Sequence, residues 1–198
     1  NIKSLLGKAV EKRLLSDRPV GCLLSGGLDS SLITALVARH YPKGHLKTFS
    51  VGMEGSVDLK YAKIVADFIG TDHTEVILTE EEMLAGIDQT IKQIESYDTT
   101  SIRASTPMYL LCKYIRENTN IAVIFSGEGS DEASGSYMYF KNAPNETEFQ
   151  EECIRLMKDL CYYDNLRCDK STAGAGLEAR VPFLDKDFLQ YYMSILPK

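Results

Sequence analysis

Apolar residues at three- and four-residue spacing open the chain and predict a first helix. Its apolar members are Ile2, Leu5, Leu6, Ala9, Val10 and Leu14. Asp17-Arg18-Pro19 ends this helical period, and the apolar run 20–24 that follows has the length of a buried strand. The chain therefore begins with a helix followed by a short core strand.

The same alternation continues through the first two thirds of the chain. Further strands are expected at 46–51, 73–78 and 121–125. Further helices are expected at 31–41, 59–69, 83–94 and 107–117. The last of these is placed at Pro107 because proline is favoured in the first helical turn. Glu80-Glu81-Glu82 reads as the acidic first turn of the preceding helix.

Strands that alternate with helices predict an α/β fold, a doubly wound parallel sheet with helices on both faces. Beyond Tyr137 the pattern becomes helical, which predicts a helical C-terminal part. Ligands bind such sheets at the carboxyl ends of the strands. The turns that follow the first, second and fourth strands should therefore face one crevice.

Composition narrows the function classes. The 198 residues carry a net charge of -6, and the pI near 5.2 argues against sequence-independent nucleic-acid binding. The longest apolar runs are strand-sized, so no membrane span is expected. Five dispersed cysteines without a C-x-x-C pair suggest reduced thiols. Together with the lack of a secretory signal, they predict a cytoplasmic protein.

The first turn, 25–31, reads Ser-Gly-Gly-Leu-Asp-Ser-Ser between a buried strand and a helix. Gly26 and Gly27 let the backbone approach a ligand, and the helix N-terminus supplies unpaired N–H groups. Ser25 and Ser30 add hydroxyl donors, so the turn is a candidate phosphate cradle. Asp29 suits such a cradle if Mg²⁺ lies between it and the phosphates. The alternative is a tight turn in which Asp29 or Ser30 caps the helix.

The turn after the fourth strand, 126–132, repeats this chemistry as Ser-Gly-Glu-Gly-Ser-Asp-Glu. Carboxylates crowded at one strand end are costly unless they share a cation or a proton. We assign Asp131 to Mg²⁺, opposite Asp29, and Glu128 to proton handling during attack by an amine. The alternative is an acidic helix start favoured by the helix dipole.

Together the two turns resemble those of the ATP pyrophosphatase superfamily. Three stretches narrow the resemblance, in order and spacing, to the synthetase domain of the glutamine-dependent asparagine synthetase family. They are 97–105 (Tyr-Asp-Thr-Thr-Ser-Ile-Arg-Ala-Ser), the Glu128 turn, and 176–185 (Gly-Leu-Glu-Ala-Arg-Val-Pro-Phe-Leu-Asp). The resemblance covers about residues 18–196, so residues 1–198 are expected to be one synthetase domain of a longer protein.

The resemblance implies that ATP and aspartate give β-aspartyl-AMP and pyrophosphate, and that ammonia then displaces AMP. It implies a pyrophosphate loop of Ser25, Gly26, Gly27, Asp29 and Ser30, and Mg²⁺ ligands Asp29 and Asp131. Leu23 and Val51 match positions near the nucleoside, and Ser126 and Gly127 match a nucleotide-binding pair. Glu128 matches a residue tied to intermediate formation and ammonia attack.

Arg103 and Arg180 are further candidates, because a guanidinium group binds carboxylate or phosphate in bidentate fashion. A structural ion pair is the equal alternative for each, with Glu178 and Asp185 as nearby partners. A homodimer is a further possibility, while no nucleic acid or membrane partner is expected.

The family pattern is not complete in this chain. The resemblance implies that ammonia comes from a glutaminase domain of the full-length protein, which this chain lacks together with the N-terminal cysteine nucleophile. The family also carries a reactive lysine in a segment beyond residue 198, so turnover by this fragment is in question. Ser136 stands where the family often has glycine, which would be strained if that position needed a positive φ.

Three other functions stay open. A beta-lactam synthetase shares the adenylating chemistry but closes a ring, and a product assay separates it from asparagine synthesis. A nucleotide-binding module without catalysis is the second, although Asp29, Glu128 and Asp131 argue against degeneration. A sulfur-transferring tRNA enzyme is the third, and it predicts paired cysteines and a basic surface, neither of which the sequence has.

Overall fold

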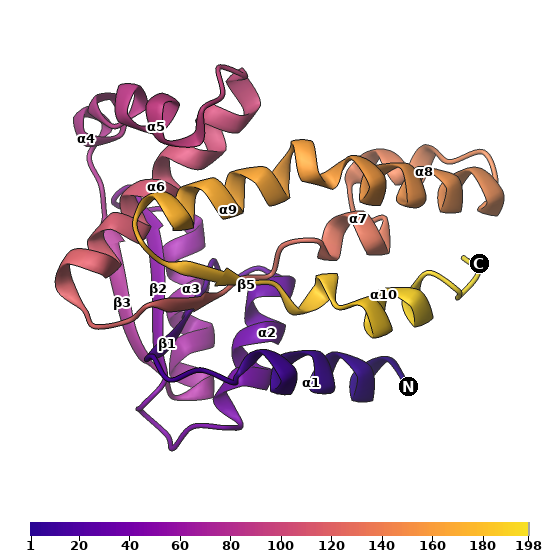
Figure 1. Cartoon of the computed structure of the whole chain (residues 1–198), viewed down its shortest axis with the longest axis horizontal. Helices are drawn as coiled ribbons and strands as arrows, with labels where there is room; N and C mark the ends of the chain where they lie inside the picture. Colours follow the sequence, from indigo (N-terminus) through magenta and orange to yellow (C-terminus); the bar gives the residue numbers. More distant parts are fainter. Residues whose placement is uncertain (198) are drawn as a thin grey trace.

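A computed structural model of the protein describes residues 1–197. Its centre is a five-stranded, entirely parallel sheet in the order β3-β2-β1-β4-β5 (Figure 1). The strands are β1 (Val20–Leu23), β2 (Lys47–Gly52), β3 (Asp72–Ile77), β4 (Val123–Phe125) and β5 (Glu178–Arg180). The first four confirm the predicted strands. The sequence pattern missed β5, since three residues are too few to show a period.

Ten α-helices and three short 3₁₀ turns surround the sheet in the described part of the chain. The helices are α1 (Ile2–Arg13), α2 (Leu28–Ala38), α3 (Val57–Ile69), α4 (Glu80–Ala85), α5 (Ile87–Ile94), α6 (Thr99–Asn118), α7 (Ser130–Ser134), α8 (Glu146–Asp159), α9 (Asp164–Gly174) and α10 (Lys186–Tyr192). The 3₁₀ turns are η1 (Met138–Asn142), η2 (Leu160–Tyr162) and η3 (Pro182–Leu184).

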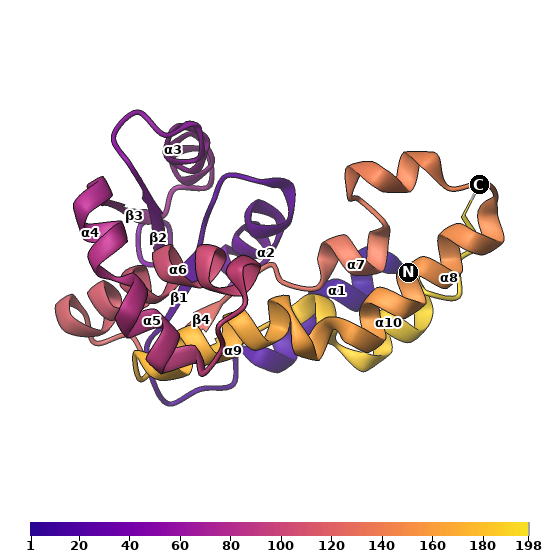
Figure 2. The ribbon, with the colours of Figure 1, turned by 90° about the horizontal axis from the view of Figure 1, so that it is seen from above.

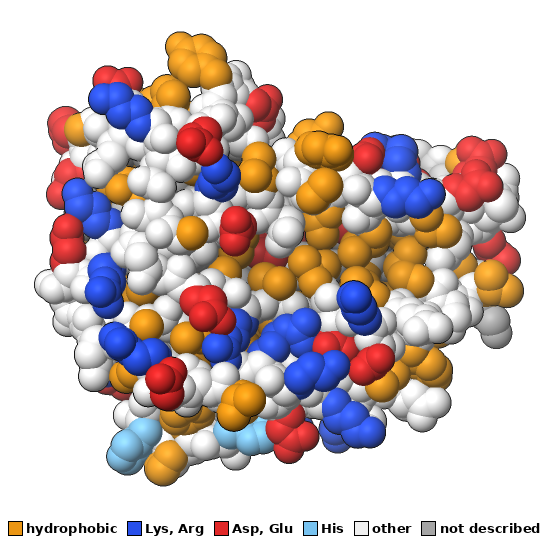
Figure 3. All heavy atoms as spheres, in the orientation of Figure 1, with side chains coloured by type: hydrophobic (Ala, Val, Ile, Leu, Met, Phe, Trp, Pro, Cys, Tyr) orange, Lys and Arg blue, Asp and Glu red, His pale blue; other side chains and the backbone are white. Residues whose placement is uncertain are grey.

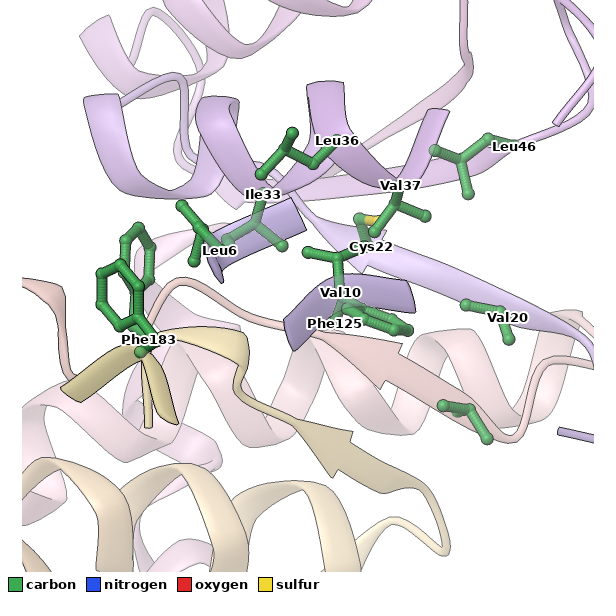
Figure 4. Packing of buried hydrophobic residues seen from close by; sticks show 12 residues of the cluster. Leu6, Val10, Val20, Cys22, Ile33, Leu36, Val37, Leu46, Phe125 and Phe183 are labelled. Atoms are coloured by element: carbon green, nitrogen blue, oxygen red, sulfur yellow. The ribbon is translucent and has the colours of Figure 1, made fainter. Parts of the chain in front are cut away.

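Helices cover both faces of the sheet, as the doubly wound fold requires. On one face α1, α2 and α10 pack against β1 and β4, and this cluster includes Val10, Val37, Cys22 and Phe125 (Figure 4). On the other face α6 and α9 cover Phe49 of β2 and the residues of β4 that alternate with Phe125. The predicted fold class is thereby confirmed.

The predicted helix at 31–41 is α2, which begins and ends three residues earlier, and two further predicted helices differ more strongly. The predicted helix at 107–117 begins eight residues earlier, where the side chain of Asp98 accepts a hydrogen bond from the backbone N–H of Ser101 at 2.8 Å. Pro107 therefore lies inside α6, and the predicted start at Pro107 is wrong. An interior proline removes one backbone hydrogen bond and crowds the preceding turn, and the packing of α6 against α9 and β2 offsets that cost. The predicted helix at 83–94 is divided at Gly86 into α4 and α5, and its acidic start is confirmed by a capping box on Thr79.

The C-terminal part of the chain is helical, as predicted. Together with α1 and α7, helices α8 and α10 extend away from the sheet, and both termini lie at that end (Figure 1, Figure 2). Hydrophobic atoms gather between α8 and α10, while basic and acidic side chains are intermixed over the rest of this face (Figure 3). Among the helices of residues 1–197, none is both long and apolar enough to cross a membrane.

Candidate active site

A crevice of about 490 Å³ opens at the carboxyl ends of β1, β2 and β4. The strand order changes direction at β1, because β2 and β3 lie on one side of it and β4 and β5 on the other. Ligands bind parallel sheets at such a switch point. Ten of the predicted site residues line the crevice: Leu23, Ser25, Gly27, Asp29, Ser30, Val51, Ser126, Gly127, Glu128 and Asp131.

The first turn is held by Ser25 and Ser30. The hydroxyls of Ser25 and Ser30 lie 2.9 Å apart, and the backbone N–H of Ser25 donates to the Ser30 hydroxyl at 3.2 Å. Gly27 is the N-cap of α2, and no side chain caps it. The alternative in which Asp29 or Ser30 caps the helix is therefore wrong. The N-terminal N–H groups of α2 are left without a side-chain cap, as an anion site requires.

Gly26 holds the same turn from behind, since it is not among the residues that line the crevice. Its φ of +80° is left-handed, and a Cβ at this position would lie 2.4 Å from the backbone nitrogen of Ala62 in α3. Glycine is therefore required here twice, for conformation and for packing. Its role is to seat the turn on α3.

The second turn lies directly against the first. A Cβ on Gly127 would come within 2.9 Å of the backbone nitrogen of Ser30, so only glycine allows this approach. The hydroxyl of Ser130 donates to Asp29 Oδ1 at 2.6 Å across 101 residues of sequence. The two turns that the sequence singled out separately are thus one structural unit.

The carboxylates of Asp29 and Asp131 carry negative charge at this junction. Burial raises the pKa of Asp29, and the charge of Asp131 acts in the same direction, whereas the Ser130 hydrogen bond opposes both. The geometry fits a divalent cation that would offset this repulsion together with phosphate oxygens. Within residues 1–197 no cluster of three or more His, Cys, Asp or Glu suited to a metal occurs.

Glu128 projects into the crevice and is paired with Arg167 of α9 at 2.7 Å. The same guanidinium group also contacts Asp164 at 3.1 Å, so its charge is shared between two carboxylates. Burial raises the pKa of Glu128, and the charges of Asp164 and Glu132 add to that effect, while Arg167 opposes it. A carboxylate with a raised pKa is suited to accept a proton.

Sequence reasoning missed much of the wall opposite the turns. The missed residues of this wall include Met108, Tyr137, Asp164 and Arg167, and Glu132 at the end of the second turn was given no role. The hydroxyl of Tyr137 donates to Glu132 beside the site. Arg167 and Asp164 come from α9, and no local signal in the sequence places this helix over the crevice.

Neither Arg103 nor Arg180 lines the crevice, so the structure does not bring these two candidates together with the ten predicted residues that do. Arg103 is exposed on α6 and borders a separate, largely apolar cavity between α4, α5 and α6. Arg180 pairs with Glu178 at 2.8 Å and donates to the carbonyl of Leu15 at 2.8 Å. The alternative of a structural ion pair is confirmed for Arg180, with Glu178 as its partner.

The predicted strain at Ser136 is absent. Glu95 is the one non-glycine residue with a positive φ in the described chain, and the left-handed conformation falls on Gly135 instead, at φ +62°. Ser136 is exposed, and its hydroxyl donates to the carboxylate of Asp131. A serine is therefore accommodated here without distortion of the turn.

The comparisons with known proteins agree with this geometry. The family model described as Asparagine synthase matches residues 1–146 and 139–198. Among curated proteins, "Asparagine synthetase [glutamine-hydrolyzing]" of Homo sapiens is 50% identical over 202 residues, covering 100% of this chain. The Gallus gallus protein of the same name is 50% identical over 199 residues, covering 98% of this chain. The chain spans only 36% of the length of each of these relatives.

A solved structure shares the fold. The U34-tRNA thiolase NcsA from Methanococcus maripaludis aligns with a TM-score of 0.54 and 16% identity, over 98% of this chain and 63% of that chain. At this identity the likeness concerns the fold alone. The resemblance inferred from the turns and the 97–105 and 176–185 stretches is confirmed at the level of the family.

Proposed function

The chain belongs to the asparagine synthase family, and from this premise we propose that it is an AMP-forming, ATP-dependent carbon–nitrogen ligase acting on aspartate. In the first step a β-carboxylate oxygen of aspartate attacks the α-phosphorus of ATP and pyrophosphate leaves. In the second step ammonia attacks the β-carbonyl carbon, AMP leaves and a proton is released. The observation that carries the proposal is the single crevice formed by the two hydrogen-bonded turns.

The crevice offers different chemistry along its length. Leu23 and Val51 supply apolar surface suited to the nucleoside, with Ser126 and Gly127 beside them. Ser25, Gly27 and Ser30 surround the uncapped N-terminus of α2, which suits the pyrophosphate part of ATP. Gly26 supports this loop from the side of α3. Each predicted nucleotide-binding residue is thereby proposed to contact or support either the nucleoside or the pyrophosphate part of ATP.

Asp29 and Asp131 would hold Mg²⁺ in this proposal. Bound there, the cation would neutralise negative charge on the phosphates. No Lys or Arg of the described residues forms a salt bridge with either carboxylate. The negative charges of Asp29 and Asp131 are therefore not balanced by a basic side chain. Their repulsion makes the nucleotide and its cation better ligands together than either is alone.

Glu128 is the proposed catalytic residue of the second step. Ammonia becomes an ammonium group when it attacks, and a nearby base must take a proton before AMP leaves. The raised pKa of Glu128 suits this role, and Arg167 orients its carboxylate through the 2.7 Å ion pair. Arg167 also keeps a positive charge beside the crevice, where the carboxylate groups of aspartate would bind.

Ammonia would come from a glutaminase domain of a longer protein, since the similar human protein is named as glutamine-hydrolysing. Free ammonia should replace that supply in a direct assay of this chain. A homodimer stays a prediction. The absence of nucleic-acid partners rests on the acidic composition alone.

The first test is thermal stability of the chain with Mg·ATP, with aspartate, and with both, using citrulline and glutamate as controls. A ligand at 100 times its dissociation constant adds about 2.7 kcal/mol of stability, which gives a clear shift in Tm. We expect a shift with Mg·ATP that grows with aspartate and with neither control. Asparagine and AMP should then form in equal amounts when ammonia is added.

The other outcomes are informative. A shift with Mg·ATP alone, without asparagine, would favour a nucleotide-binding module that does not turn over. Growth of the shift with another amino acid would favour a relative that closes a ring. No shift with any nucleotide would refute the proposed function for this chain.

A further inference from the structure

Each of the two carboxylates proposed to hold Mg²⁺ receives a hydrogen bond from a serine. Ser130 donates to Oδ1 of Asp29 at 2.6 Å, and Ser136 donates to Oδ1 of Asp131. Among residues 1–197 no second side chain donates a hydrogen bond to either carboxylate. Each carboxylate therefore has one oxygen engaged by the protein and one left available.

The two serines act from outside the crevice. Neither Ser130 nor Ser136 lines the cavity, whereas Asp29 and Asp131 both do. Ser130 is buried, with 8% of its surface exposed, and Ser136 is exposed at the far end of α7. Asp131 thus lies in helix α7, between Ser130 at the N-terminal end of that helix and Ser136 just past its C-terminal end.

We propose that Ser130 and Ser136 are positioning residues that restrict Asp29 and Asp131 to binding the cation through one oxygen each, and thereby favour Mg²⁺ over Ca²⁺. This inference rests on the proposed function, because it assumes that a nucleotide and its divalent cation bind in the crevice. Mg²⁺ requires six ligands in near-ideal octahedral geometry, with carboxylates usually bound through single oxygens. Ca²⁺ takes six to eight oxygens and accepts both oxygens of a carboxylate. A hydroxyl that donates a hydrogen bond to one carboxylate oxygen disfavours binding of the cation through both oxygens of that carboxylate.

The test is the ratio of the dissociation constants of Ca·ATP and Mg·ATP, measured by isothermal titration calorimetry with each metal in excess of ATP. Partners that orient ligating carboxylates are worth about 10- to 100-fold in metal affinity. We expect Ser130→Ala to weaken Mg·ATP about tenfold and Ca·ATP much less, so that the ratio falls. Ser136→Ala should change the ratio in the same direction by a smaller factor, because this residue is exposed.

The chain offers two matched controls. Ser134 lies on the same helix, but its hydroxyl donates to the backbone carbonyl of Ser130 at 2.8 Å, so Ser134→Ala should leave the ratio unchanged. Ser136→Thr keeps a hydroxyl and should retain the preference of the wild type. The ratio does not depend on the folded fraction of a preparation, because both constants are measured on the same sample.

The possible results distinguish a failure of the proposed function from a failure of the proposed role of Ser130 and Ser136. If the wild type binds neither complex, the proposed function fails and this inference fails with it. If the wild type binds Mg·ATP but Ser130→Ala and Ser136→Ala weaken both complexes equally, the inference is overturned and the proposed function stands. A change of the ratio in Ser134→Ala as large as in Ser130→Ala would also overturn it.

Discussion

Asp185 and Glu128 are both paired with arginine, yet their environments shift their pKa values in opposite directions. Asp185, at the start of α10, has 5% of its side chain exposed and contacts Arg13 at 2.7 Å and Lys12 at 2.9 Å. It also accepts from the backbone N–H groups of Asp187 and Phe188. Burial by itself would raise the pKa of Asp185, but these donors outweigh it and lower the pKa to about 2.

Glu128, in the crevice, has 16% of its side chain exposed and a single arginine that it shares with Asp164. Its other hydrogen bond comes from the Ser126 hydroxyl at a long 3.4 Å. Burial therefore prevails and the pKa of Glu128 is raised. The difference teaches that an arginine alone does not make a carboxylate structural. Asp185 is fully satisfied and holds helices together, whereas Glu128 is left partly uncompensated, as functional groups often are.

The largest expected effect is that of Glu128→Gln, which tests whether Glu128 is a functional carboxylate. Glu128→Gln removes the proposed proton acceptor, and ammonia-dependent asparagine formation should fall about 10²- to 10⁴-fold. Binding of Mg·ATP should change little, as calorimetry can verify. In the wild type, activity should rise with pH through a pKa above 4.5, because the acceptor must be deprotonated and its pKa is raised. Undiminished synthesis by the variant would remove Glu128 from the mechanism.

Asp185→Asn tests whether Asp185 is a structural carboxylate that stabilises the fold. This substitution leaves Arg13 and Lys12 without their shared charged partner, while the amide oxygen still accepts from the start of α10, so the expected cost of about 2–3 kcal/mol comes from the lost charge-assisted hydrogen bonds. The stabilisation from Asp185 is complete above its ordinary pKa of 3.8 and is lost as pH falls toward 2, because the folded-state pKa is depressed. Urea unfolding between pH 6 and 2.5 should show this acid dependence in the wild type and less of it in the variant.

Asp187→Asn is the matched control for that experiment. Asp187 is 72% exposed and contacts only Lys12 at 3.2 Å among the basic residues of the described chain. Its replacement should change the unfolding free energy by less than about 0.5 kcal/mol. Equal effects of the two substitutions would contradict the distinction between a saturated, buried carboxylate and a surface one.

The contact between the two turns gives the next prediction. Gly127→Ala places a Cβ 2.9 Å from the Ser30 nitrogen and 3.0 Å from the Asp29 carbonyl carbon, so the turns must separate. We expect a loss of about 1–3 kcal/mol in stability and a weaker Mg·ATP complex by calorimetry. Gly7→Ala is the control, since nothing lies within 4 Å of a Cβ there and alanine should stabilise α1 by about 0.5–1 kcal/mol.

The smallest effect concerns His73, a half-buried side chain held by hydroxyl groups and not by an ion pair. His73 contacts the Thr48 hydroxyl at 2.9 Å and the Ser50 hydroxyl at 3.1 Å. Burial lowers its pKa below 6.5, and Lys63 acts in the same direction, while Glu75 and Asp67 oppose both. The contribution of neutral His73 to stability is thus complete above pH 6.5 and declines as pH falls.

His73→Gln should remove that dependence. We expect the unfolding free energies of wild type and variant to differ by about 1 kcal/mol at pH 7.5 and to converge toward pH 5. Chemical unfolding of both proteins at each pH gives the difference between their unfolding free energies. Contributions from other titrating groups are common to both proteins and cancel in that difference. A constant difference between the two proteins across this range would show that His73 does not titrate as inferred.

The sequence by itself determined the class of fold and one half of the candidate site. Strands β1 to β4 and the glycine-containing turns after β1 and β4 could be predicted because their signals are local. These signals are apolar runs of strand length, and paired glycines beside serines and carboxylates. The family resemblance rested on the same local stretches.

Only the tertiary structure decided the other half. The three residues of β5 are a strand because β4 pairs with them, and Pro107 stays helical because α6 packs on the sheet and on α9. Arg180 is a structural residue because the end of α1 supplies its acceptors, and Arg167 belongs to the crevice because α9 crosses to Glu128. These contacts join residues that are distant in sequence, so no local period or motif contains them.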